Sequence, residues 1–339
     1  MYFDELPTAA TASYAALSSA ALAETVRTVA SLPGSFSRKT VKGKVYWYYQ
    51  LANLVCGQSQ IFLGPDGPEL AQLIGQHKGA APQGQHLRRL ARLAIAAGCP
   101  YLAPNHARII ARLADAGFFK AGGILIGTHV YMAYQNMLGV RWRSGAHTQD
   151  LDFAHPGRNV SLALPTNVTM DTKEAIESLK MGFVPVKSLT TYIKSDEADL
   201  QIDFVTTLHR AGAAPLRIDA LNIEMQPLKF MEFAMESPIQ VVLLSNMGPI
   251  VVNAPPPEKY AVHKLLVYGE RPQAMRPKAG KDLEQAATLI AYLGEHDQDA
   301  LHDAWQDLVG RGKGWRERAE LGRQALAARH PGLDLSCLR

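Results

Sequence analysis

The spacing of hydrophobic residues changes twice within the first 118 residues. Apolar residues recur at helical spacing over residues 8–32, and the Pro33-Gly34 pair marks the end of that helix. Residues 35–64 carry aromatic and β-branched runs that are interrupted twice by glycine, which predicts a three-stranded antiparallel meander. Helical spacing then returns from residue 68 to about residue 118. The pattern therefore predicts one helix, a meander and a further group of helices.

The middle of the chain begins with a different pattern. A short apolar run, ILI, is followed by a Gly127-Thr128 turn and by a helical pattern that ends at Gly139. These residues predict a strand, a tight turn and a helix. Residues 148–154 then alternate polar and apolar positions as a half-buried strand does.

The rest of the chain predicts two hairpins and a helical end. Residues 188–208 and 239–254 each show two β-rich runs around a polar turn, and helical spacing dominates from residue 258 onward. Together the elements predict an α+β fold with a mixed central sheet. We divide the chain into an N-terminal helical and meander region, a central core and a helical C-terminal region, at residues 1–118, 119–255 and 256–339.

Composition narrows the class of protein. The chain has 339 residues, 47% of them hydrophobic and 19% charged, with a net charge of +4. These values exclude a disordered or collagen-like chain, and the small positive excess is compatible with a polyanionic partner. No stretch reaches the roughly 18 unbroken apolar residues of a membrane span. Because the three cysteines are odd in number and far apart, we expect no disulfide framework and a cytoplasmic location.

Asp150 and Asp152 are the first candidates for chemistry. Side chains two positions apart in a strand project from the same face, so the two carboxylates repel unless a cation lies between them. Oxygen ligands suit Mg²⁺ or Mn²⁺ better than zinc. A third carboxylate, Asp203, lies in an apolar strand and also needs a partner, which the sheet could supply. The alternative is that these aspartates form a solvated strand face.

The Gly127-Thr128 turn is the second candidate. It opens a helix, and the backbone N–H groups and positive dipole end of a helix N-terminus can hold phosphate. The alternative is a simple N-cap supplied by the Thr128 hydroxyl.

In this order, the turn and the aspartates resemble the nucleotidyltransferase superfamily of DNA polymerase β. The segments GTHVYMAYQNMLGVRW and TQDLDFA are most similar to bacterial abortive-infection-type nucleotidyltransferases. The phrases AGFFKAGGILIGTH and AVHKL also look like a bacterial nucleotidyltransferase-like family. The resemblance covers roughly residues 115 to 295 and implies that the mixed sheet is a nucleotidyltransferase core. It further implies that the turn holds a triphosphate, and that Asp150, Asp152 and Asp203 are the catalytic, metal-binding residues.

The same resemblance assigns the nucleotide-binding residues Gly127, Thr128, Lys264, Lys281 and Asp282. Lys264 matches a lysine that contacts the nucleotide in the relatives, and Lys281-Asp282 opens the next helix as a basic-acidic pair does there. The alternatives are a surface lysine whose stem covers apolar residues and an aspartate placed near a helix N-terminus. We interpret His263 as a packed or surface histidine and not as a base.

The N-terminal meander offers a separate candidate surface for nucleic acid. Basic and aromatic residues can follow a phosphate backbone and stack on bases, whereas the same alternation also fits an aromatic core face. The candidate nucleic-acid-binding residues are Arg38, Lys39, Lys42, Lys44, Tyr46 and Trp47. A run of basic residues from Arg311 to Arg329 offers a second basic surface.

The sequence therefore predicts an enzyme that uses Mg²⁺ or Mn²⁺ to transfer a nucleoside monophosphate from an NTP to an acceptor hydroxyl. By resemblance, tRNA is one candidate acceptor and a toxin or defence effector is one candidate role. The alternative is a catalytically silent nucleic-acid-binding protein on the same scaffold.

Overall fold

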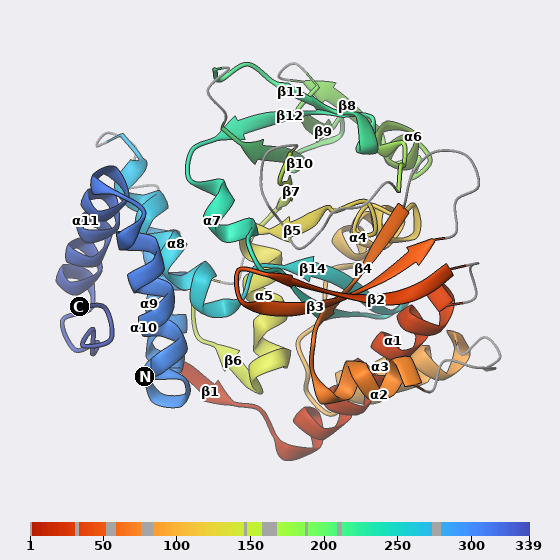
Figure 1. Cartoon of the computed structure of the whole chain (residues 1–339), viewed down its shortest axis with the longest axis horizontal. Coiled ribbons are helices and arrows are strands. Elements are labelled where there is room, and N and C mark those ends of the chain that lie inside the picture. The colour runs from red at the N-terminus through yellow and green to blue at the C-terminus, as the bar shows by residue number, and fades with distance from the viewer. Residues whose placement is uncertain are drawn as a thin grey trace.

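In the computed structural model a seven-stranded mixed sheet occupies the centre of the molecule (Figure 1). The described residues are 2–30, 34–51, 59–75, 84–145, 148–157, 168–186, 189–208, 212–272 and 279–339. The sheet strands are β5 (Ile124–Ile126), β7 (Asp150–His155), β8 (Phe183–Val186), β9 (Thr191–Lys194), β10 (Glu197–Thr207), β11 (Leu216–Ile218) and β12 (Ile223–Leu228). The long strand β10 pairs in parallel with β7 and β12 and antiparallel with β9. The predicted α+β fold with a mixed sheet is confirmed.

Helix α5 (Gly127–Leu138) leaves the sheet directly after β5, which confirms the predicted strand, turn and helix. The helix ends at Gly139, whose left-handed backbone (φ 72°) favours glycine. The buried residues Leu151, Phe153 and Phe204 form the opposite face of β7 and β10, so the aspartates of these strands lie on the other face. Shorter elements complete this part of the chain: α4 (Pro104–Asp115), α6 (Thr172–Glu177), the 3-10 turn η1 (Asp219–Leu221) and α7 (Met231–Met235).

A hairpin made of β13 (Ile239–Ser245) and β14 (Gly248–Ala254) lies apart from the main sheet and joins it to the N-terminal helices. Buried residues of α1 (Thr8–Ala30) and α3 (Gly84–Ala96) share a hydrophobic cluster with this hairpin. The Tyr14 hydroxyl also donates a 2.8 Å hydrogen bond to the Val242 carbonyl. The first helix therefore packs on residues more than two hundred positions away.

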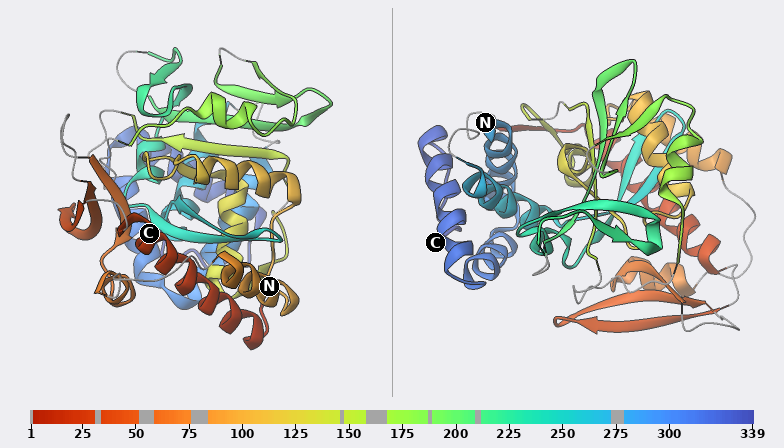
Figure 2. Two further views of the ribbon diagram at one scale, coloured as in Figure 1. Left: turned by 90° about the vertical axis from the view of Figure 1, so that its right-hand side faces the viewer. Right: turned by 90° about the horizontal axis from the view of Figure 1, so that it is seen from above.

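The N-terminal meander forms as predicted, from β2 (Gly34–Val41), β3 (Lys44–Leu51) and β4 (Ser59–Pro65), followed by α2 (Pro68–Gly75). It lies at the edge of the molecule in the right-hand view of Figure 2. Tyr46 and Tyr48 are 1% and 0% exposed and pack in a cluster with residues of β5, β7 and α7. The prediction that Tyr46 offers its ring to nucleic acid bases is therefore wrong, because the ring is buried in the core.

The hydrophobic pattern of the sequence does not predict one of the strand pairings. Strand β1 (Phe3–Glu5) pairs antiparallel with β6 (Val140–Trp142), which follows α5. The Phe3 ring meets the ring of Tyr292 at 5.3 Å between centroids. The N-terminal segment thus ties the central core to the C-terminal helices.

Four helices make up the end of the chain: α8 (Pro257–Glu270), α9 (Gly280–His296), α10 (Gln298–Gly310) and α11 (Lys313–Arg329). They gather on one side of the sheet in Figure 1 and in the right-hand view of Figure 2. Helices α8 and α11 approach closely at Gly322, where a Cβ atom would lie 2.1 Å from the Leu265 carbonyl oxygen. Among the described residues, no helix combines the length and apolar character that a membrane crossing needs.

The structure describes two of the three cysteines. Cys99 and Cys337 are buried free thiols, and Cys56 lies outside the described residues.

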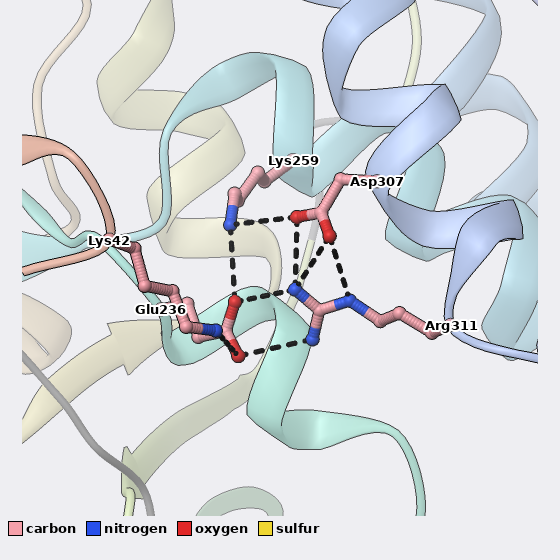
Figure 3. Close-up of polar contacts among 5 residues, drawn as sticks. All are labelled: Lys42, Glu236, Lys259, Asp307 and Arg311. Atoms are coloured by element: carbon pink, nitrogen blue, oxygen red, sulfur yellow. Dashed lines mark hydrogen bonds and ion pairs between the residues drawn. The ribbon is translucent and has the colours of Figure 1, made fainter.

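A charged cluster joins the meander, α7 and the C-terminal helices (Figure 3). The buried Glu236 carboxylate accepts hydrogen bonds from Arg311, at 2.5 Å to Nη2, and forms a 2.8 Å ion pair with Lys42 of the meander turn. Lys259 of α8 lies 3.5 Å from Glu236 and 3.5 Å from Asp307 of α10. Burial raises the pKa of Glu236, but Arg311 and Lys42 outweigh burial and lower that pKa to about 2.

We predict that Glu236→Gln destabilises the protein by about 3 kcal/mol at pH 7, because three cations lose their shared buried partner. A lowered carboxyl pKa contributes stability above the unfolded value of 4.5 and loses it as pH falls towards about 2, so the difference between wild type and variant should shrink in that range. Chemical denaturation at several pH values measures both effects.

Glu317→Gln is the matched control, because among the described residues Glu317 forms an exposed 3.8 Å pair with Lys313, so the substitution should change stability by less than about 1 kcal/mol. Equal effects of the two substitutions would contradict a structural role for the cluster.

Candidate active site

A cavity of about 340 Å³ lies where the central sheet meets α5, α7, α8 and α9. This volume falls within the range of roughly 300–1,000 Å³ that small-molecule pockets occupy. Its walls include Gly127 and Thr128 of the turn and the carboxylates Asp150 and Asp152. The candidate residues that are far apart in sequence therefore meet at one hollow.

The sheet register sets the positions of the three aspartates. Asp203 on β10 is the register partner of Asp152 on β7, and neighbouring strands lie about 4.8 Å apart. Asp150 and Asp152 line the cavity from the same face of β7, whereas Asp203 lies beside Asp152 outside the cavity lining. The Asp203 carboxylate accepts a 2.5 Å hydrogen bond from the Thr191 hydroxyl.

Asp152 has an electrostatic environment that opposes its charge. Burial has the largest effect and Asp203 the next, and together they raise the pKa of Asp152 to about 6 in spite of the nearby Lys264. A carboxylate that is desolvated next to like charges gains stability when a cation arrives.

The turn after β5 lies directly over that carboxylate. Ile126 pairs with Asp152 in the sheet, and a Cβ atom on Gly127 would lie 2.0 Å from Asp152 Oδ2. Gly127 also has a φ of +68°, a backbone conformation that side chains disfavour. Glycine is therefore required here both by the backbone angle and by the space that the Asp152 carboxylate takes.

Thr128 does not cap α5. The N-cap position belongs to Ile126, and no side chain caps this end among the described residues. The Thr128 hydroxyl instead accepts a 3.2 Å hydrogen bond from Gln285 Nε2 of α9. The interpretation of Thr128 as a simple N-cap is wrong, and the uncapped first turn of α5 faces the cavity.

Basic side chains from α8 and α9 form the opposite wall. Lys264 Nζ donates to Asp282 Oδ1 at 2.8 Å, and Arg271 Nη2 donates to Asp282 Oδ2 at 2.9 Å. Burial opposes the charge of Lys264, but Asp282 outweighs it and raises the lysine pKa. Burial, followed by the charge of Lys264, lowers the pKa of Lys281. The cavity thus holds carboxylates on the sheet side and cations on the helix side.

Three residues of this site were missed in the sequence. Arg271 follows the last residue of α8 with an extended backbone, so the helical spacing that places Lys264 does not reach it. The Tyr260 hydroxyl lies 2.8 Å from Gln285 Oε1 and 3.0 Å from the Gly127 carbonyl oxygen, and these two acceptors share its one proton. Gln285 Nε2 donates to the Gly145 carbonyl at 2.8 Å. Nothing in the sequence identifies Gln285, because its partners come from distant segments.

The oxygen donors suit Mg²⁺ or Mn²⁺. In the part of the chain that the structure describes, no three His, Cys, Asp or Glu side chains are arranged as a complete metal cage. Mg²⁺ usually takes only one or two protein carboxylates and fills its other positions with water and substrate phosphates. Asp150 and Asp152, with the raised pKa of Asp152, match that kind of partial site.

The meander residues that we predict to bind nucleic acid do not line this cavity. Arg38 forms a 2.6 Å ion pair with Asp66, which also accepts a 2.6 Å hydrogen bond from Trp47 Nε1. The Lys39 ammonium lies 5.4 Å from the centre of the Tyr48 ring, and Lys44 is exposed. Lys42 is engaged by Glu236. The nucleic-acid contacts of Arg38, Lys39, Lys42, Lys44 and Trp47 remain a prediction.

Acidic side chains neutralise much of the basic run at the end of the chain. Arg318 pairs with Glu270, Arg323 with Glu320 and Arg329 with Glu284. The second basic surface is therefore smaller than the sequence suggests.

Comparison with known proteins gives one match. The model of a family described as "Nucleotidyltransferase" matches residues 105–310, which is more than half of the chain. The match includes every residue named above as lining the cavity. No curated protein and no solved structure matches the chain.

We predict that Asp152→Asn stabilises the metal-free protein at neutral pH. An aspartate whose pKa rises from 3.8 to about 6 on folding binds more protons in the native state, so wild-type stability falls as pH rises between these values. The variant should lack that loss, which is on the order of 3 kcal/mol. Denaturation in EDTA from pH 4 to pH 7 measures it, with the exposed Asp303→Asn as control. Parallel pH profiles for wild type and Asp152→Asn would contradict the assignment.

A second prediction uses a matched pair of glycines. Gly43 has a φ of +76° like that of Gly127, but no atom lies within 4 Å of its Cβ position. Gly127→Ala and Gly43→Ala should each lose about 1–2 kcal/mol to the left-handed backbone. Only Gly127→Ala should also move the Asp152 carboxylate and reduce the stability change between pH 4 and pH 6 in the same assay. An unchanged profile in Gly127→Ala would show that the turn and the carboxylate are independent.

Proposed function

The chain belongs to the nucleotidyltransferase family, and we propose on this premise that it moves a nucleoside monophosphate from an NTP to an acceptor hydroxyl in a metal-dependent reaction. One observation carries the proposal. Asp150 and Asp152 share a single cavity with the uncapped N-terminus of α5 and with Lys264 and Lys281. Carboxylates for a metal and cations for a triphosphate are the groups that phosphoryl transfer needs within reach of one substrate.

In this proposal the α5 N-terminus and the basic wall bind the triphosphate. The N–H groups of the first helical turn favour phosphate oxygens, and Gly127 leaves the space for phosphate to approach the backbone. Lys264 is held by Asp282 and stays protonated at neutral pH because its pKa is raised. With Lys281 and Arg271 it would counter the charge that develops on the leaving pyrophosphate.

Asp150 and Asp152 would hold Mg²⁺ or Mn²⁺, and the bound ion would supply charge neutralisation for the transferred phosphoryl group. Asp203 is a candidate to orient or deprotonate the acceptor hydroxyl, and Thr191 fixes its carboxylate for that task. Because Asp203 could act on the acceptor hydroxyl, and the other carboxylates and the cations could bind the metal and the triphosphate, the proposal needs no histidine base.

The acceptor that we propose is RNA, tRNA included. Lys39 and Lys44 lie on the meander, whose turn reaches α7 through Lys42 and Glu236. Such cations, of which Lys44 is exposed, would bind a phosphate backbone in a salt-dependent way. The role as a toxin or defence effector belongs to the same proposal and predicts growth arrest on expression.

The test is transfer of label from each of four α-³²P-labelled NTPs, with Mg²⁺, to total RNA or to cell protein. Asp150→Ala and Asp152→Asn should abolish transfer, because each removes a metal-binding carboxylate, and EDTA should do the same. Lys264→Ala should raise the NTP concentration needed for half-maximal rate. Asp303→Ala, at an exposed aspartate outside the cavity, should leave the rate unchanged.

Three outcomes would contradict the proposal. Full activity of the Asp152→Asn enzyme would reject the metal-binding assignment. If the protein binds RNA but no NTP, a catalytically silent nucleic-acid-binding protein is favoured. If the label is transferred to protein and not to RNA, RNA is rejected as the acceptor.

A further inference from the structure

Gln285 of α9 is fully buried and bonds three segments that meet near the cavity. Its side chain has 0% exposure. Oε1 lies 2.8 Å from the Tyr260 hydroxyl of α8, and Nε2 lies 2.8 Å from the Gly145 carbonyl oxygen and 3.2 Å from the Thr128 hydroxyl oxygen. Thr128 and Tyr260 line the cavity, whereas Gln285 lies behind them. Any effect of Gln285 on a ligand must therefore pass through these neighbours.

The partners of Gln285 fix the orientation of its amide. A carbonyl oxygen can only accept a hydrogen bond, so the amide nitrogen must face Gly145 and the amide oxygen must face Tyr260. One hydrogen of Nε2 then goes to the Gly145 carbonyl, and the other points to the Thr128 hydroxyl oxygen. Both polar atoms of the amide have partners, and the opposite orientation would break the bond to Gly145.

This amide also sets the direction of the Thr128 hydroxyl proton. A hydroxyl that accepts a hydrogen bond from an N–H group turns its own proton away from that group. Among the described residues, no group accepts this proton. Thr128 is the second residue of α5 and lines the cavity, so the hydroxyl lies beside the uncapped N–H groups of the first helical turn. A phosphate oxygen bound at this helix end would supply the acceptor.

The oxygen of the amide reaches the same turn through Tyr260. The Tyr260 hydroxyl also lies 3.0 Å from the Gly127 carbonyl oxygen, so Gln285 and Gly127 share its proton. The Tyr260 side chain is buried, and the Lys264 ammonium lies 5.1 Å from the centre of its ring. Gln285 therefore holds α8, which carries Lys264, at a fixed position relative to the first turn of α5.

We propose that Gln285 is a positioning residue for the triphosphate: its amide holds the first turn of α5 against α8 and directs the Thr128 hydroxyl proton towards a phosphate oxygen. The inference rests on the proposed function, because it takes the triphosphate to bind at the N-terminus of α5. Gln285 itself touches no ligand. Without the amide, the Thr128 hydroxyl could rotate, and a phosphate would lose a donor that is aligned before it binds.

The experiment measures the binding of inorganic tripolyphosphate, ATP, CTP, GTP and UTP to the full chain by calorimetry with Mg²⁺. The variants are compared with whichever of these binds wild type most tightly. Gln285→Met keeps the length of the side chain but removes the amide, so it should weaken binding about tenfold. Thr128→Val replaces the hydroxyl by a methyl group and should weaken binding by a similar factor. Thr128→Ser, which restores a hydroxyl, should recover most of that loss.

A double variant and a control distinguish positioning from general destabilisation. If Gln285 acts through Thr128, adding Gln285→Met to Thr128→Val should weaken binding by much less than the further tenfold that independent effects would give. Gln135→Met is the matched control. Gln135 is also buried, at 4% exposure, and accepts a 2.9 Å hydrogen bond from the Trp142 N–H, but it does not line the cavity. This control should lower thermal stability and leave the affinity unchanged.

The results separate this inference from the function on which it rests. If wild type binds neither tripolyphosphate nor any of the four NTPs, the proposed function fails and the inference fails with it. If wild type binds one of them and Gln285→Met binds it equally well, only the positioning role is overturned. Losses that multiply in the double variant, or an equal loss in Gln135→Met, would overturn that role too. If Gln285→Met does not fold, an unchanged affinity in Thr128→Val is enough to reject the inference.

Discussion

The close approach of Gly127 to the Asp152 carboxylate is the constraint on which the candidate site depends. The sheet pairs Ile126 with Asp152, so the chain must turn immediately over the carboxylate, and a Cβ at Gly127 would lie 2.0 Å from Oδ2. The absence of a side chain at Gly127 therefore allows the N-terminus of α5 to lie directly against the buried Asp152 carboxylate. The phosphate-binding and metal-binding parts of the proposed site are thus set by the register of two strands.

Buried polar contacts then hold the helical wall against that turn. Asp282 holds Lys264 and Arg271, and Gln285 connects Tyr260 and Thr128, so α8, α9 and α5 are joined by hydrogen bonds at the cavity. Each of these buried side chains has a hydrogen-bond partner, and buried polar networks stabilise a fold when their members are satisfied in this way. The cations are consequently fixed before any ligand arrives, and a preorganised site of this kind needs little rearrangement to bind an anion.

The meander is coupled to the same wall at a different point. Glu236, at the C-terminal end of α7, forms ion pairs with Lys42, Lys259 and Arg311. Met231, at the other end of α7, lines the cavity. A change in the meander could thus reach the cavity through a short rigid helix. Lys42 thus contributes to the fold, and its contact with nucleic acid stays a prediction.

The sequence by itself determined the elements with strong periodicity and the aspartates that share one face of β7, because side-chain direction within one element follows from spacing alone. Only the tertiary structure decided which partner each face meets. It buried Tyr46 against the core, paired β1 with β6, and brought Arg271 to the cavity. It also placed Gln285 behind the cavity wall, against Tyr260 and Thr128. These outcomes depend on contacts between segments from about ten to more than a hundred residues apart. The periodicity of a sequence indicates which face of an element is buried. Packing and ion pairing between distant elements determine which neighbour buries that face.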